Sequence, residues 1–338
     1  MIRQARLYGP RDLRVEEVPF PTMHDDDVLV DVSACGICGS DLGFYERGSI
    51  RGDGQPMPLG HEFSGVIRAV GSSVQHFVPG MRIVVNPMAN GVMIGIGSDD
   101  GALSPTVCVR NVSRGPILHA LPDHVPTELA ALVEPLAVSL HAVNRSRITA
   151  GERALVLGAG AIGLGIVASL KQRGIAQIAV ADVSSKRLEI AARLGADVLI
   201  DPGHQDVWQS LAQTHGTVPT LLGTVAPATH VIFESSGVGS VLHDAISHAR
   251  DGARITVAST YKQPLSIDFS ILLVKELEMI GTMCYPTEFA AALDLIASGT
   301  FEVEAMISHR FALGEIDKAY QTAANPHASA KVLVMPGG

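Results

Sequence analysis

The chain carries a thiol, an imidazole and a carboxylate close together in sequence, and these are side chains that bind zinc. Cys38 stands in the run CGICGSD at residues 35–41, and His61 and Glu62 follow in the run GHE at 60–62. A thiolate, a histidine and a carboxylate suit Zn²⁺ and leave one coordination position open. The residue types and their spacing therefore indicate a metal site of the catalytic kind.

Cys35 and Cys38 form a Cys-x-x-Cys pair, which has two other interpretations. A structural zinc site needs a second cysteine pair, and the sequence has none. A redox dithiol needs a βαβ pattern nearby, and that pattern lies far downstream. We expect Cys38 alone to bind the metal, Cys35 to be a small packed residue, and Asp41 to orient a ligand histidine.

A glycine-rich turn, Gly158-Ala-Gly160-Ala-Ile-Gly163, lies between an apolar strand and an apolar helix. Glycines in this context let a pyrophosphate approach the helix N-terminus, where free N–H groups and the helix dipole bind it. A purely structural turn is the alternative, because glycines are common in this chain. The strand–turn–helix context favours a dinucleotide, and a metal site and a dinucleotide site on one chain suggest metal-assisted hydride transfer.

Asp182 ends the next strand, where a carboxylate accepts both hydroxyls of the adenosine ribose. The same carboxylate repels a 2′-phosphate, so we expect NAD rather than NADP. Lys186 and Arg187 are the charges that would hold such a phosphate; with Asp182 present, Arg187 is expected to bracket the ribose and Lys186 to be solvated. The predicted cofactor-binding residues are Gly158, Gly160, Ala161, Ile162, Gly163, Asp182 and Arg187.

Length and composition are those of a two-domain globular protein. The chain has 338 residues, of which 47% are hydrophobic and 17% are charged, and this length exceeds what one compact core usually holds. The net charge of −9 and the lack of a lysine and arginine cluster argue against a nucleic-acid partner.

The sequence also predicts a cytoplasmic protein without a membrane partner. Its first residues lack the apolar core of a signal peptide. The uncharged stretch 154–170 contains the glycine-rich turn, which is typical of a buried strand, turn and helix rather than a membrane span. Four cysteines (Cys35, Cys38, Cys108 and Cys284) do not make a disulfide framework, so a reducing compartment fits.

The secondary-structure elements that must position these residues follow two patterns along the chain. Residues 1–110 are β-rich, with alternating runs such as Val28–Val32 and Arg82–Val85. From Glu152 strands and helices alternate, which predicts a parallel sheet with helices on both faces. The strands predicted from there on are Ala154–Gly158, Gln177–Asp182, Asp197–Ile200, His230–Glu234, Arg254–Ala258, Leu277–Met283 and a last strand Lys331–Met335. The predicted helices are Glu128–Val133, Pro135–Asn144, one that ends at Arg173, Ser185–Leu194 and Glu288–Ala297.

Ordered motifs along essentially the whole chain carry a family resemblance. They are CGSD at 38–41, GHEFSGV at 60–66, EPLAV at 134–138, the glycine-rich turn, and the segment 187–197 with its Leu-Gly-Ala-Asp end. Together they resemble the zinc-dependent medium-chain alcohol dehydrogenases, and most of all their polyol branch of sorbitol, L-idonate and 2,3-butanediol dehydrogenases.

The resemblance implies an α/β protein with two domains. A GroES-like, β-rich catalytic domain would comprise residues 1–135 and 284–338, and a doubly wound Rossmann domain that binds NAD would comprise 136–283. It also implies a homodimer or homotetramer that acts on a small-molecule alcohol or ketone.

The resemblance further implies one catalytic zinc. Its ligands would be Cys38, His61 and the pair Glu62 and Glu134. A carboxylate at position 134 is typical of the polyol branch; a solvated acid at a helix start is its alternative. Ser40 would accept the proton of the substrate hydroxyl, and Ser40, Asp41 and Glu62 are the predicted catalytic residues.

Two departures from the family pattern matter. Most relatives carry four closely spaced cysteines that bind a structural zinc, whereas residues 86–106 contain none, so we expect no structural zinc. Relatives also usually have a histidine two residues after Asp41 to carry the proton outward, and this chain has Gly43.

The predicted function is a zinc-dependent, NAD-linked dehydrogenase that reversibly oxidises a secondary hydroxyl of a polyol or diol to a ketone. One alternative is a metal-free, quinone-reductase-like NAD(P)H oxidoreductase, although those relatives lack the cysteine, histidine and glutamate set. The other is a non-catalytic dinucleotide-sensing protein, which would bind cofactor and zinc without turnover.

Overall fold

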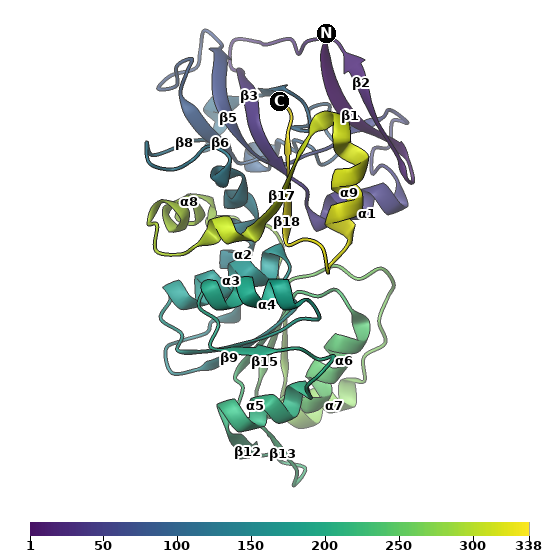
Figure 1. Ribbon diagram of the computed structural model, residues 1–338, viewed down its shortest axis with the longest axis vertical. Coiled ribbons are helices and arrows are strands. Elements are labelled where there is room, and N and C mark those ends of the chain that lie inside the picture. Colours follow the sequence, from purple (N-terminus) through teal and green to yellow (C-terminus); the bar gives the residue numbers. More distant parts are fainter. Residues whose placement is uncertain (338) are drawn as a thin grey trace. The chain divides into compact units, whose positions relative to one another are not determined.

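A computed structural model describes residues 1–337, and in it the chain forms two compact units (Figure 1). Unit 1 comprises Met1–Glu134, Ile296–Ser298 and the described residues from Ile307 onward; unit 2 comprises Pro135–Leu295 and Gly299–Met306.

Unit 1 is built on a seven-stranded sheet in the order β17-β18-β3-β5-β6-β8, with β7 paired to β3. These strands are β3 (Val28–Gly36), β5 (Glu62–Val70), β6 (Arg82–Val85), β7 (Thr106–Val109), β8 (Leu118–Ala120), β17 (Ile307–Ala312) and β18 (Lys331–Met335). A smaller sheet contains β1 (Ile2–Gly9), β2 (Asp12–Val18) and β4 (Met57–Pro58). Apolar side chains of both sheets, Leu7 and Phe63 among them, share one hydrophobic core.

The helices of unit 1 are short. They are α1 (Gly39–Arg47), α9 (Ile316–Ala324) and the 3₁₀ helices η1 (Ala89–Gly91), η2 (Val112–Arg114), η3 (Leu129–Leu132) and η5 (Leu313–Glu315). Figure 1 shows α9 against β17 and β18, where its Ala319 and Tyr320 are buried in the core.

Unit 2 contains the predicted parallel sheet, in the order β11-β10-β9-β14-β15-β16. Its strands are β9 (Arg153–Leu157), β10 (Gln177–Ala181), β11 (Val198–Ile200), β14 (Val231–Glu234), β15 (Arg254–Val257) and β16 (Glu278–Gly281). Every pair is parallel, which confirms the interpretation of the alternating strands and helices. Strands buried on both faces are apolar throughout, as Leu155, Val156 and Leu157 of β9 illustrate.

Helices surround this sheet, and several were not predicted. The observed helices are α2 (Val133–Ser146), α3 (Ala161–Gln172), α4 (Ser185–Arg193), α5 (Val207–His215), α6 (Gly239–His248), α7 (Phe269–Lys275), α8 (Phe289–Ala297) and the 3₁₀ helix η4 (Val303–Met306). No sequence pattern predicted α5, α6 or α7. The hairpin of β12 (Thr217–Pro219) and β13 (Val225–Pro227), which forms its own two-stranded sheet, was not predicted either.

Residues 284–295, which include most of α8, and Gly299–Met306 lie in unit 2, whereas the sequence predicted that all residues from 284 onward belong to the other domain. Glu288 accepts hydrogen bonds from His141 (2.9 Å) and Asn144 (3.0 Å) on α2. These contacts join Cys284–Leu295 to unit 2. The first boundary between the two units falls after Glu134, one residue before the predicted boundary after residue 135. Helix α2 begins at Val133 and so contains Pro135 in its first turn. Proline is tolerated there because an N–H in the first turn has no partner within the helix.

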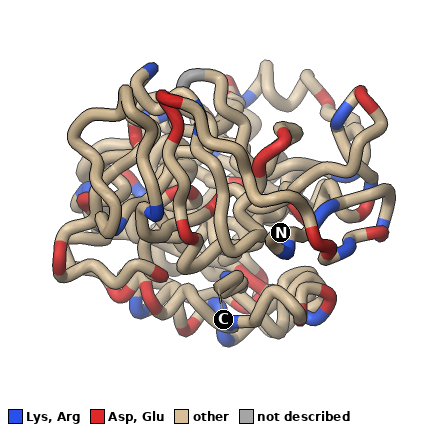
Figure 2. The backbone as a smooth tube through the Cα atoms, turned by 90° about the horizontal axis from the view of Figure 1, so that it is seen from above, with Lys and Arg blue, Asp and Glu red and all other residues tan. Residues whose placement is uncertain are grey.

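Acidic and basic residues are interspersed over the described part of the chain (Figure 2), and the net charge of the whole sequence is −9. None of the helices that the structure describes is long and apolar enough to cross a membrane.

Candidate active site

Cys38 lies at the junction between β3 and α1, where it is the residue that precedes the helix. Its backbone N–H donates to the Asp41 carboxylate (2.9 Å), so Asp41 caps the first turn of α1 and fixes the loop. Gly36, the last residue of β3, leaves room for the Glu62 side chain, because a Cβ atom at Gly36 would lie 2.1 Å from a Glu62 oxygen. Glycine at this position lets the Glu62 side chain pass close to the backbone.

The register of β3 and β5 brings the predicted ligands together. Gly36 pairs with Glu62 across the two antiparallel strands, and His61 directly precedes β5. Gly60 has φ +95, a conformation that glycine adopts without strain. As a result, ligand atoms of Cys38, His61 and Glu62 lie within 4.8 Å of one another.

His61 is almost fully buried and lies between two polar partners. Its Nδ1 is 3.5 Å from the Asp41 carboxylate, and its Nε2 is 3.5 Å from the Ser40 hydroxyl. Burial by itself lowers the pKa of His61, but the negative charges of Asp41 and Cys38 outweigh burial and raise this pKa well above its usual value. The cluster therefore attracts a cation, whether a proton or a metal ion.

Cys35 differs from Cys38 in its surroundings. Its side chain is fully buried in the core of unit 1, and burial raises the pKa of its thiol well above the usual value. A neutral thiol is a poor metal ligand, so Cys35 has the packing role that the sequence predicted.

Lys331 is a site residue that the sequence analysis missed. Its Nζ donates to both Glu62 oxygens (2.6 and 2.8 Å) and to the Ile37 carbonyl (3.1 Å), and both charged side chains are buried. Burial lowers the pKa of Lys331, but the Glu62 carboxylate outweighs this effect and raises it. A lysine at the start of the apolar strand KVLVM was the available signal.

Glu134, the remaining predicted ligand, lies in the first turn of α2 and is 5% exposed. Its charge is among those that raise the pKa of Lys331, although its carboxylate is not one of the three clustered ligand groups. A partly exposed thiol, a buried imidazole and a buried carboxylate, with further carboxylates near them, form a donor set that fits Zn²⁺.

Gly43, the position where relatives were expected to carry a histidine, faces another side chain of its own helix. A Cβ atom at Gly43 would lie 2.8 Å from the guanidinium of Arg47. Arg47 therefore occupies the space into which a side chain at position 43 would grow.

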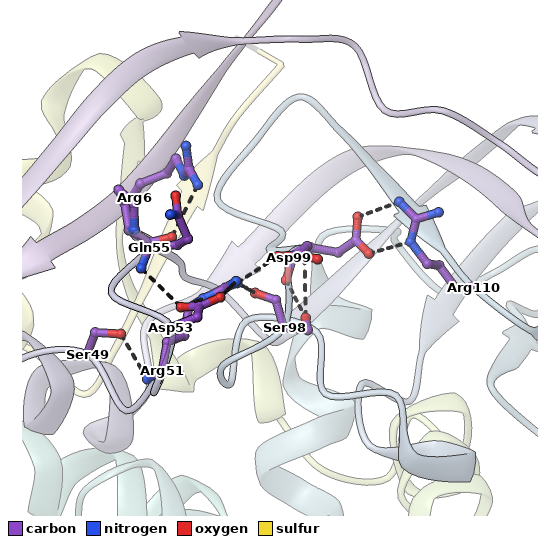
Figure 3. A network of polar contacts seen from close by, with 10 residues as sticks. Arg6, Ser49, Arg51, Asp53, Gln55, Ser98, Asp99 and Arg110 are labelled. Atoms are coloured by element: carbon purple, nitrogen blue, oxygen red, sulfur yellow. Dashed lines mark hydrogen bonds and ion pairs between the residues drawn. The ribbon is translucent and has the colours of Figure 1, made fainter.

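Polar contacts hold the cysteine-free segment 86–106 (Figure 3). Arg51, whose side chain is 9% exposed, bonds to Asp53 (2.5 Å), Asp99 (2.8 Å) and the Ser98 carbonyl (2.9 Å). Arg110 pairs with Asp100 (2.8 Å) further along the segment. Charged hydrogen bonds thus tie this segment to its neighbours in unit 1.

The glycine-rich turn of unit 2 joins β9 to α3. Gly158 has φ +95, and a Cβ atom at Gly163 would lie 1.8 Å from the Gly158 carbonyl oxygen. Gly160 precedes α3, and no side chain caps the helix there. The first N–H groups of α3, at Ala161 and Ile162, therefore have no capping side chain in front of them. An anion site at a helix N-terminus requires this.

Asp182 follows β10 beside this turn and is 7% exposed. Its carboxylate accepts hydrogen bonds from the N–H groups of Ala159 (2.6 Å) and Ser184 (2.8 Å). Arg187 lies 4.0 Å from the same carboxylate, and burial lowers the pKa of its guanidinium. The structure thus brings Asp182 and Arg187 together next to the turn.

Comparisons with known proteins agree with this architecture. Residues 24–118 match the family model described as an alcohol dehydrogenase GroES-like domain, and residues 161–298 match the one described as a zinc-binding dehydrogenase. The prediction of a GroES-like domain with a Rossmann sheet is confirmed.

Individual relatives span nearly all of the chain. It is 31% identical to (R,R)-butanediol dehydrogenase from Neisseria gonorrhoeae (99% of each chain). It is 32% identical to sorbitol dehydrogenase from Bos taurus (94% of this chain, 91% of the relative). The crystal structure of 2R,3R-butanediol dehydrogenase from Bacillus subtilis is similar, with a TM-score of 0.86 and 30% identity over 99% of this chain and 100% of that chain. The protein is therefore a dehydrogenase, a member of the polyol branch of the zinc-dependent medium-chain alcohol dehydrogenases.

Proposed function

We propose that this protein uses zinc and NAD to oxidise a secondary hydroxyl of a polyol or diol to a ketone, reversibly. The observation that carries the proposal is the cluster of Cys38, His61 and Glu62 ligand atoms within 4.8 Å. The names of the relatives add the substrate class, because sorbitol and butanediol both contain secondary hydroxyls.

Cys38, His61 and a carboxylate, Glu62 or Glu134, would hold the zinc. Bound there, zinc would polarise the reacting oxygen and lower the pKa of the substrate hydroxyl. A carboxylate in place of a second thiolate makes the site harder and more polar, which suits a substrate that presents a second hydroxyl. We expect one zinc per chain and no structural zinc, because 86–106 offers no cysteine and Arg51 holds part of it by charge.

The proton moves through side chains of unit 1. Ser40 accepts the proton that the substrate hydroxyl loses, and its Oγ lies 3.5 Å from His61 Nε2. Asp41, 3.5 Å from His61 Nδ1, holds the imidazole in orientation. Since Gly43 carries no group that can take the proton further, we expect water or another side chain to complete its transfer to solvent.

The dinucleotide would bind to unit 2, where its nicotinamide ring supplies the hydride acceptor. Gly158, Gly160, Ala161, Ile162 and Gly163 would receive the pyrophosphate. Asp182 would accept the ribose hydroxyls, with Arg187 beside it, and its negative charge would exclude the 2′-phosphate of NADP. NAD is therefore the proposed cofactor.

We further propose a cytoplasmic homodimer or homotetramer, without nucleic-acid or membrane partners. All four cysteines are free thiols, in keeping with a reducing compartment. The outer strand β16 ends near exposed Met283 (75%), and the neighbouring α7 exposes Phe269 (73%) and Leu273 (79%). An exposed sheet edge with apolar side chains nearby supports self-association.

The test is a substrate panel measured with NAD and with NADP. We expect kcat/KM to be higher for vicinal diols and sugar alcohols than for ethanol or benzyl alcohol, and higher with NAD. A chelator should abolish turnover, and added zinc should restore it. Preference for primary alcohols would overturn the polyol assignment, and full turnover after complete zinc removal would overturn the metal mechanism.

A further inference from the structure

A fully buried carboxylate ends β14, the strand beside β9 in the parallel sheet. One oxygen of Glu234 accepts hydrogen bonds from the N–H groups of Ser236 (2.8 Å) and Gly237 (3.2 Å) and from the Ser236 hydroxyl. The other oxygen accepts from the hydroxyls of Ser259 and Tyr261. Five donors thus converge on one side chain with no exposed surface.

These donors come from two separate loops. Ser236 and Gly237 lie between β14 and α6, whereas Ser259 and Tyr261 lie between β15 and α7. An ionised carboxylate only accepts, and its hydrogen bonds are stronger than those between neutral groups. Glu234 therefore joins the two loops to each other through charge-assisted bonds.

The first of these loops supports the glycine-rich turn. A Cβ atom at Gly158 would lie 2.9 Å from the Ser236 Cα, and one at Gly163 would lie 2.8 Å from the Ser235 hydroxyl oxygen. That hydroxyl donates to the Gly158 carbonyl (2.8 Å). The backbone held by Glu234 is therefore in direct contact with the proposed pyrophosphate-binding turn.

Sheet topology indicates what part of the cofactor these loops receive. Ligands of doubly wound sheets bind beyond the carboxyl ends of the strands, at the point where the strand order reverses, here between β9 and β14. Asp182 would bind the adenosine ribose on the β10 side of the turn. The other half of an extended dinucleotide then lies over the ends of β14 and β15, where Glu234 and its donors are.

The second loop packs Tyr261 and Leu265 against the hydrophobic core of unit 2, and it also borders open space. Val257, Tyr261 and Leu265 line a hollow of about 510 Å³ between this loop and α6. The bond from the Tyr261 hydroxyl to Glu234 is a polar contact that ties this side chain to β14.

We propose that Glu234 is a positioning residue, which holds the Ser236 loop and the Ser259–Tyr261 loop in the arrangement that receives the nicotinamide half of the cofactor. This inference rests on the proposed function, since it assumes dinucleotide binding to unit 2. Glu234 acts through its two loops and not by contact with the cofactor.

The decisive variant is Glu234→Gln, which keeps the shape and removes the charge. An amide NH₂ cannot accept, so the donors of one of the two loops lose their acceptor. We expect the Kd of NADH to rise on the order of 10-fold or more, since losing hydrogen bonds to a charged group has about that effect. The Kd of ADP should rise by a clearly smaller factor, because ADP lacks the nicotinamide half and meets only the glycine-rich turn that the Ser236 loop supports. Both constants are measured by fluorescence or calorimetric titration of the full chain.

Milder variants keep the test decisive if Glu234→Gln does not fold. Tyr261→Phe and Ser259→Ala each remove one donor from the second loop. Each should raise the NADH Kd by a smaller factor than Glu234→Gln does, and should raise it more than the ADP Kd. The matched control is Glu152→Gln. Glu152 pairs with Arg254 at the opposite, amino end of the same sheet, so this variant should leave the ratio of the two constants unchanged.

The outcomes separate this inference from the proposed function. If the wild type binds neither NADH nor ADP, the proposed function itself is wrong. If the wild type binds both, and the Glu234 and Tyr261 variants change both constants equally or not at all, the positioning role is refuted while dinucleotide binding stands.

Discussion

Lys331 and Glu62 form a buried ion pair at the proposed zinc site, with Nζ 2.6 Å from one carboxylate oxygen and 2.8 Å from the other. Each Glu62 oxygen can still accept a second partner, so a metal ion bound to Glu62 would share the carboxylate with Lys331. Lys331 therefore competes with zinc for Glu62, and a second carboxylate such as Glu134 becomes more important as a ligand.

Lys331→Met should destabilise the protein by about 3–5 kcal/mol, because it leaves the Glu62 carboxylate buried without a counter-charge. The double variant Lys331→Met/Glu62→Gln should recover much of this loss, since a neutral amide is less costly to bury. Denaturant unfolding of the metal-free chain measures both. Equal stability of wild type and Lys331→Met would show that the pair contributes nothing.

Cys38→Ser should abolish stoichiometric zinc binding, because it removes the one thiolate of the proposed set. Cys35→Ser is the matched control, and we expect it to lower stability but to leave zinc content per folded chain unchanged. Elemental analysis of both variants and of the wild type provides the readout. Two zinc ions per wild-type chain would contradict the expectation of a single catalytic site.

Asp182→Ser should shift cofactor choice towards NADP, because it removes the negative charge that a 2′-phosphate would meet. We expect the ratio of kcat/KM with NADP to that with NAD to rise on the order of 10²-fold. Asp201→Ser, which changes the carboxylate that follows the next strand β11, is the control and should leave the ratio as it is. A wild type that prefers NADP would disprove the role given to Asp182.

Ser40→Ala should lower kcat on the order of 10²-fold or more, which is the usual contribution of a positioned proton-transfer group. Zinc content should be retained, since Ser40 is not a ligand. Steady-state kinetics over a range of pH, with zinc analysis alongside, provide the comparison. An unaltered kcat would rule out Ser40 as the first proton acceptor.

The buried histidine of unit 2 should make stability depend on pH. Burial, with the charges of Arg153 and His230, lowers the pKa of His215 to about 4, so the unfolded chain takes up a proton at higher pH than the folded one. Acidification from about pH 6.5 towards 4 should therefore destabilise the fold, by about 2 kcal/mol at pH 5 relative to pH 7.5.

Replacing the histidine and its hydrogen-bond partner together tests this origin. His215 bonds to Thr229 (2.8 Å), and the variant His215→Leu/Thr229→Val should have a flatter stability profile between pH 4 and 6.5. His204→Gln changes an exposed histidine and should keep the wild-type slope. If the double variant also keeps that slope, groups other than His215 are responsible.

Much of the fold of unit 2 could be predicted from the sequence, because short local patterns mark most of its sheet strands. A glycine-rich turn between apolar runs marked β9 and α3, and the helix predicted at Ser185–Leu194 is observed as α4 (Ser185–Arg193). The hairpin of β12 and β13 gave no such signal, since each strand has three residues and contains or borders proline. The position of Cys284–Leu295 depended on contacts of Glu288 with α2, which no local pattern encodes.

The residues of the candidate site also divide into those that local sequence patterns predicted and those that only the structure revealed. Cys38, His61 and Glu62 were predictable because their residue types and spacing are typical of zinc ligands, and β3 and β5 then bring them together. A lysine at the start of an apolar strand marked Lys331 as unusual, but its role could not be predicted, since its partner lies 269 residues earlier in the chain. Glu234 likewise became conspicuous only when the structure placed donors from two loops around it.

The distance in sequence between Glu62 and Lys331 also has a consequence for biosynthesis. The ribosome completes Glu62 long before Lys331, and all of unit 2 is made in the interval. During that time β3 lacks its neighbour β18, and the Glu62 carboxylate lacks its counter-charge. We therefore expect the parallel sheet to mature first on the nascent chain, and the metal-binding unit to acquire its native structure only after β18 has emerged from the exit tunnel.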